Sequence, residues 1–117
     1  IFEGANDIGL FTTQQIVAAL DTMVGYALGA GKKVALCTLV PKDNTAIDAA
    51  LTAEVSQAIR NLKNTKYASA ANVVLVDLHA TFPLSGLGDD GIHPNPDGYA
   101  FMAQKFFEVI RANFETR

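Results

Sequence analysis

Near the carboxyl end of the chain, residues 89–94 read Asp-Asp-Gly-Ile-His-Pro, which places a carboxylate three positions before a histidine. A turn through Gly91 brings the Asp90 carboxylate within reach of the His93 imidazole. A carboxylate on one ring nitrogen fixes the tautomer and stabilises the imidazolium, so the other nitrogen can act as a general base. Those are two members of a serine-type triad. The same spacing also occurs where an aspartate caps a turn beside a solvated histidine, so the spacing alone leaves both interpretations open.

A second loop, at residues 4–11, offers a different kind of group. Asn6 follows a strand-like run at residues 1–3 and a Gly-Ala pair. Its side-chain amide can donate to an anionic oxygen, as amides do in oxyanion holes, where loss of one donor typically costs about 3 kcal/mol of barrier lowering. The alternative is that Asn6 and Asp7 close an Asx turn and cap the next helix.

Strand and helix patterns alternate along the segments that must position these loops. The predicted strands cover residues 1–3, 33–40 and 73–78, and the predicted helices cover 12–28, 46–63 and 96 to the end. The first helix is preceded by a capping-box sequence, Thr12 with Gln15, and the last by asparagine and proline. The two long strand patterns are continuously apolar, which is typical of parallel strands covered on both faces.

This order predicts an α/β fold with a parallel sheet and right-handed crossovers. In such sheets ligands bind outside the carboxyl ends of the strands. The loop at residues 4–11 and the long loop at 79–95 both leave carboxyl ends of strands. We therefore expect Asn6 and His93 to lie on one rim of the sheet.

The bulk composition excludes several classes of protein. The 117 residues suffice for one domain; half are apolar, 18% are charged, and the net charge is −3. Lys and Arg form no stripe, which argues against a nucleic-acid partner, and no apolar run is long enough to span a membrane. The single cysteine, Cys37, falls within a buried-strand pattern, where we expect an unreactive side chain.

The Gly-x-Asn-Asp block at residues 4–7 and the Asp-x-x-His-Pro block at 90–94 resemble the third and fifth sequence blocks of the GDSL, or SGNH, hydrolases. The continuation at residues 93–99, followed by an apolar helix, resembles the ending of the same family. The resemblance covers essentially the whole chain. It implies a flavodoxin-like three-layer α/β/α fold with a parallel sheet, and hydrolysis of carboxylic esters without a cofactor.

The resemblance also implies a role for each matching residue. Asn6 matches the oxyanion asparagine, His93 the general base and Asp90 its orienting acid. Asp7 is expected to hold its loop through backbone hydrogen bonds. The implied substrate is a small acyl ester, with acetylated carbohydrate as the first candidate, and the expected location is secreted or periplasmic.

The chain also departs from the family pattern. The first block, with the nucleophilic serine, and the second block, with an oxyanion glycine, have no counterpart here, and Ser56, Ser69 and Ser85 stand in no matching setting. We therefore expect residues 1–117 to be the C-terminal portion of a single SGNH domain that lacks the N-terminal strands. Its apolar sheet edge would then need a complementing N-terminal segment or a second copy of the chain.

Three alternatives remain at this point. One alternative is a non-catalytic binding protein that keeps the fold, and another is an unrelated flavodoxin-like module that matches both blocks by chance. The acidic cluster with His93 could also be read as a metal site, but its spacing matches no common ligand pattern, so no metal is expected. The cluster comprises Asp89, Asp90, His93 and Asp97.

Overall fold

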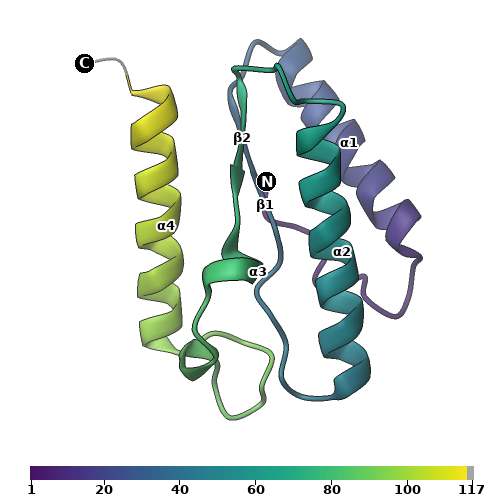
Figure 1. Cartoon of the computed structure of the whole chain (residues 1–117), viewed down its shortest axis with the longest axis vertical. Helices are drawn as coiled ribbons and strands as arrows, with labels where there is room; N and C mark the ends of the chain where they lie inside the picture. The colour runs from purple at the N-terminus through teal and green to yellow at the C-terminus, as the bar shows by residue number, and fades with distance from the viewer. Residues whose placement is uncertain (116–117) are drawn as a thin grey trace.

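Two parallel strands lie between helices on both faces in this computed structural model, which describes residues 1–115 (Figure 1). Strand β1 (Val34–Cys37) pairs with β2 (Val73–Val76) in parallel register. Helices α1 (Thr13–Gly29) and α2 (Ala46–Asn64) cover one face, and α4 (Pro96–Phe114) covers the other. Between β2 and α4 lie the short helix α3 (Leu78–Thr81) and the 3₁₀ turn η1 (Leu84–Gly86). The predicted α/β class, with a parallel sheet between helical layers, is confirmed.

The core has two parts, one on each face of the sheet. Val34 and Leu36 belong to the cluster under α1 and α2, whereas Cys37 belongs to the cluster under α4. Val73 and Val76 divide between the two clusters in the same way. Since side chains alternate between the faces of a strand, an apolar run without polar alternation is what a sheet covered on both faces requires.

The helix starts lie where the sequence predicts them. Thr12 and Gln15 form the expected capping box at α1, and the Asn95 side chain accepts the N–H of Gly98 at the start of α4. Thr45 caps α2 by accepting the N–H of Asp48. These caps satisfy N–H groups that have no partner inside the helix, so their effect depends only on residues a few positions apart.

The strands are shorter than predicted. Strand β1 ends at Cys37, three residues before the end of the apolar pattern at residues 33–40. It ends there because the N–H of Leu39 donates to Ser56 Oγ on α2 (3.2 Å) instead of to a neighbouring strand. Strand β2 ends at Val76 rather than at residue 78, because Asp77 caps α3 by accepting the N–H of Ala80. The long predicted loop at residues 79–95 accordingly contains the end of α3 and η1.

Residues 1–3 do not form a strand, although Ile1 lies beside β1 as a strand would. Its amino group donates to the Ala35 carbonyl at 2.7 Å, and its carbonyl accepts the N–H of Cys37 at 3.0 Å. The N–H groups of Val34 and Thr38 point the other way, toward β2 and its flank. Ile1 therefore occupies the edge of β1 opposite β2.

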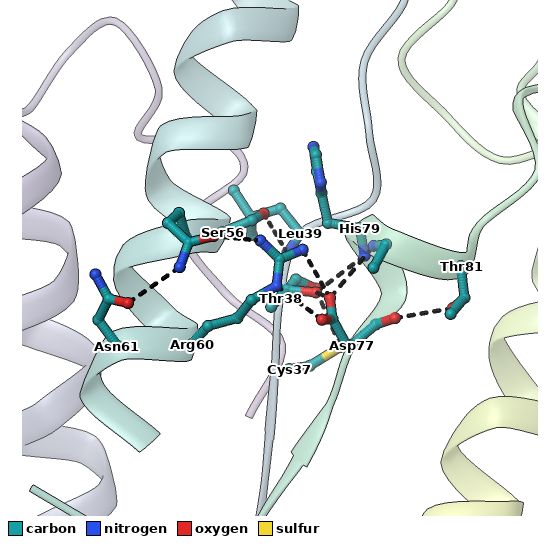
Figure 2. A network of polar contacts seen from close by, with 11 residues as sticks. Cys37, Thr38, Leu39, Ser56, Arg60, Asn61, Asp77, His79 and Thr81 are labelled. Carbon is teal, nitrogen blue, oxygen red and sulfur yellow. Dashed lines mark hydrogen bonds and ion pairs between the residues drawn. The ribbon is translucent and has the colours of Figure 1, made fainter. Parts of the chain in front are cut away.

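A polar network joins the carboxyl ends of both strands to α2 (Figure 2). Arg60 donates from Nε and Nη2 to the two carboxylate oxygens of Asp77, at 2.7 and 3.0 Å. Thr38 Oγ1 donates to Asp77 Oδ1 at 2.9 Å and accepts the N–H of His79. Burial by itself would raise the pKa of Asp77, but the hydrogen bonds from Arg60, Thr38 and Ala80 outweigh burial, and the pKa is lowered overall.

We predict that Asp77→Asn lowers the free energy of unfolding by about 1–2 kcal/mol near neutral pH, because it leaves the Arg60 guanidinium without its anion. Because the pKa of Asp77 is lower in the folded state than in the unfolded chain, its ionisation stabilises the fold fully at pH values above the unfolded pKa of 3.8. This stabilisation is lost as the pH falls through the pKa of Asp77 in the folded state. The difference between the two proteins should therefore shrink below about pH 4. Urea unfolding at several pH values measures this, with the exposed Asp89→Asn as control. Equal loss in both variants would contradict the role given to the network.

Candidate active site

One cavity of about 170 Å³ brings together the two loops that the sequence singles out. Asn6 reaches it from the loop at residues 4–11, and His93 reaches it from the loop that precedes α4. Val40 and Lys42, which follow β1, also line it, so the cavity lies beyond the carboxyl end of the sheet. The expectation that Asn6 and His93 share one rim is therefore confirmed.

A tight backbone turn presents Asn6. Gly4 has φ +105°, and a Cβ there would lie 2.9 Å from the Ile16 side chain. The N–H of Asp7 donates to the Gly4 carbonyl at 3.2 Å, and the Asp7 carbonyl accepts the N–H groups of Leu10 and Phe11. The turn is thus held by the backbone of Asp7. Within residues 1–115 the Asn6 side chain makes no hydrogen bond, so its amide can donate to a ligand.

The second loop folds Asp90 back onto His93. Gly91 has φ +66°, its N–H donates to the Gly88 carbonyl at 3.0 Å, and the N–H of Gly88 donates to the His93 carbonyl at 2.7 Å. In this turn Asp90 Oδ1 accepts the N–H groups of Ile92 and His93, each at 2.9 Å, while Oδ2 lies 2.6 Å from His93 Nδ1. Asp90 is therefore both a turn cap and the partner of the imidazole.

The charge on Asp90 sets the tautomer of His93. The hydrogen bond from the His93 ring, together with the two backbone N–H groups, lowers the pKa of Asp90 to about 2. An ionised carboxylate only accepts hydrogen bonds, so Nδ1 of a neutral His93 carries the proton and Nε2 holds a lone pair. The His93 side chain is 73% exposed, and within the described part of the chain Nε2 has no hydrogen-bond partner. The pair has the arrangement that a general base requires.

We predict that His93→Ala raises the pKa of Asp90 from about 2 toward the ordinary value of 3.8, because the largest cause of the lowering is removed. The backbone N–H groups remain, so the shift should be incomplete. A ¹³C NMR titration of the carboxyl group measures it, with His79→Ala as the control. An Asp90 midpoint that is the same in all three proteins would rule out the Asp90–His93 hydrogen bond.

The connection at residues 41–44 joins the two loops to each other. Lys42 Nζ donates to the Ala5 carbonyl, next to Asn6, at 3.3 Å. The N–H of Asp43 donates to the carbonyl of Gly91 at 2.8 Å. The sequence predicts only a polar loop here and gives Lys42 no role. Its position just beyond a buried strand was the available signal, since the carboxyl ends of strands form the binding rim.

Helix α4 fixes the other end of the His93 loop. Asn95 Nδ2 donates to the carbonyls of Ser85 and Leu87, at 2.8 and 3.1 Å, while its Oδ1 caps the helix. Gly98 packs so closely against η1 that a Cβ there would overlap the Gly86 carbonyl oxygen. The segment after His93 is therefore anchored to the start of the helix.

We predict that Gly91→Ala destabilises the fold by about 2–4 kcal/mol and displaces the Asp90–His93 turn. A side chain would be strained at φ +66°, and its Cβ would lie 2.9 Å from the backbone of Asp43 and Asn44. Thermal unfolding and the NMR shifts of residues 88–93 measure the two effects. Gly25→Ala is the matched control, because a Cβ there meets nothing within 4 Å and lies within helix α1, where alanine is favoured. A Gly91→Ala protein as stable as the wild type would show that the turn tolerates a side chain.

Neither the three serines nor the cysteine lines this cavity. Ser56 is buried on α2 and bonded to Leu39, Ser69 lies in the turn before β2, and Ser85 is in η1. Burial raises the pKa of Cys37 to about 12, so its thiol stays protonated at neutral pH.

Residues 1–115 contain neither a metal-ligand cluster nor a helix suited to span a membrane. No group of three or more His, Cys, Asp or Glu side chains there is arranged to hold a metal ion. None of the helices in this range has the length and apolar character to cross a membrane.

The chain matches the model of a known protein family. The family model described as GDSL-like Lipase/Acylhydrolase family matches residues 1–101, which include Asn6, Asp90 and His93. No curated protein matches the chain.

Proposed function

Because this chain belongs to the GDSL-like lipase/acylhydrolase family, we propose that it supplies His93, Asp90 and Asn6 to the serine-type hydrolysis of carboxylic esters. One observation carries the proposal. Asn6 and His93 line the same cavity although they are far apart in the sequence, and the Asp90 carboxylate forms a hydrogen bond with Nδ1 of His93. That arrangement supports an orienting acid, a base and an oxyanion donor acting on one ester.

In the proposed mechanism a serine hydroxyl oxygen attacks the ester carbonyl carbon, and His93 Nε2 takes the hydroxyl proton. The amide of Asn6 donates to the oxyanion that forms on the carbonyl oxygen. When the intermediate collapses, the bond to the alcohol oxygen breaks and His93 returns the proton to the leaving alcohol. Water then attacks the acyl-enzyme by the same path, which releases the carboxylic acid and restores the serine.

The serine is proposed to come from a complementing N-terminal segment of the same protein. Phe2 and Phe11 expose apolar side chains in the same N-terminal stretch as Ile1, which pairs with the edge of β1. Beside α1, a largely apolar cavity of about 350 Å³ is lined by Phe11, Leu20 and other residues. Such surfaces are typical of an interface with another segment or with a second copy of the chain.

The size of the cavity supports a small acyl group. A volume of about 170 Å³ corresponds to roughly five or six water molecules, and sites for drug-sized ligands are generally about 300 Å³ or larger. Its lining is mostly apolar, with Val40 and Met102 among its walls. An acetyl ester of a carbohydrate is the first candidate substrate, by likeness to the family alone. The secreted or periplasmic location stays a prediction.

We predict that His93→Ala lowers ester hydrolysis by at least about 1,000-fold when the chain is combined with a segment that carries the serine, because no group then takes the serine proton. Release of p-nitrophenol from p-nitrophenyl acetate measures this. His79→Ala is the matched control, since His79 lies outside the cavity. Turnover that is unchanged in His93→Ala would overturn the assignment.

The absence of a serine from the described cavity lining also fits a non-catalytic binding protein of the same fold. Two measurements separate this candidate from the hydrolase. A denaturing mass spectrum shows whether purified material carries a second, serine-bearing segment, and a fluorophosphonate probe shows whether any serine is activated. A complemented protein that reacts with the probe supports the hydrolase. A complemented protein that neither reacts nor hydrolyses esters supports the binding protein.

A further inference from the structure

Among residues 1–115, Lys42 brings the one permanent positive charge to the candidate cavity, and no carboxylate side chain of this range lines it. The ion pairs formed within residues 1–115 do not include Lys42. Its side chain is half-buried, and the remaining lining is mostly apolar. An ammonium with apolar neighbours attracts an anion more strongly than one in open water, because the surroundings screen its charge less.

The ammonium lies on the Asn6 side of the cavity. Its hydrogen bond to the Ala5 carbonyl, the residue before Asn6, uses one of its three N–H donors. The hydrogen bond from the next residue, Asp43, to the Gly91 carbonyl ties the same connection to the turn that carries His93. Lys42 is thus held between the two loops and keeps donors for a ligand.

We propose that Lys42 is a binding residue for a carboxylate group in this cavity. An ammonium forms charge-assisted hydrogen bonds with a carboxylate, and Asn6 supplies a further donor from the same cavity. The identity of the carboxylate rests on the proposed function. It is either the acid released from the acyl half of the ester or an acidic group on the alcohol half.

Titration with sodium acetate at constant ionic strength, followed by ¹⁵N NMR of the Asn6 side-chain amide and the His93 ring, tests this proposal. Acetamide, the neutral compound of the same shape, is the control ligand. We expect saturable shifts with acetate and not with acetamide. Lys42→Met should weaken acetate binding by at least about fivefold, since it removes the charge and keeps most of the apolar stem.

Two further variants separate charge from structure. Lys42→Arg keeps the charge and should bind acetate within about twofold of the wild type, because guanidinium also pairs with carboxylate. Lys32→Met removes one positive charge at an exposed position outside the cavity and should leave binding unchanged. Three outcomes would each overturn the proposal. These are equal acetate binding in Lys42→Met and wild type, equal shifts with acetamide and acetate, and no shifts at all.

The same titration with glucuronate and with glucose identifies the half of the ester involved. Glucuronate binding that Lys42→Met weakens supports an acidic alcohol half, and a response to acetate alone supports the released acid. Neither the acetate titration nor the glucuronate titration requires a serine or turnover. A protein that binds acetate through Lys42 but shows no ester hydrolysis after complementation therefore contradicts only the proposed function, and active enzyme with no anion binding contradicts only the role of Lys42.

Discussion

Parallel pairing of β1 and β2 is the constraint on which the rest of the structure depends. Two parallel strands cannot be joined by a hairpin, so the chain crosses over through α2 and starts the second strand at the same end as the first. Both carboxyl ends consequently lie at one rim, where the segments that follow them meet. Asn6, Lys42 and His93 reach a common cavity because each belongs to a loop at that rim.

Backbone hydrogen bonds and side-chain caps then fix the loops. The N–H and the carbonyl of Asp7 hold the turn that presents Asn6. In the 41–44 connection, the Lys42 side chain donates to the Asn6 loop and the backbone N–H of Asp43 donates to the His93 loop. Left-handed glycines occur at Gly4 and Gly91, where the chain reverses and approaches another segment too closely for a Cβ. Main-chain hydrogen bonds and these side-chain contacts together hold the loops that line the candidate site.

Two groups of polar side chains lie at this end of the sheet, and they differ in how fully their hydrogen-bonding groups are paired. Arg60, Asp77 and Thr38 satisfy one another, so they stabilise the strand ends and leave nothing to react (Figure 2). In the candidate site, by contrast, Asp90 is satisfied while Asn6, Lys42 and the outer nitrogen of His93 retain unused hydrogen-bonding capacity. Groups with such unused capacity at a cavity are what ligand binding requires, and the saturated network is what structural stability requires.

The sequence by itself determined the features that depend on neighbouring residues. The capping box at Thr12, the asparagine cap of α4 and the turn that puts Asp90 on His93 each involve groups within a few positions, so spacing and residue type predict them. The parallel α/β order also followed from the pattern, because periodicity reports which faces are buried. Only the tertiary structure decided where the strands end, since hydrogen bonds from distant side chains such as Ser56 divert the backbone. It alone decided that Lys42 joins the site, because its contact with Ala5 spans 37 positions, and no local rule predicts which segments a folded chain brings together over that separation.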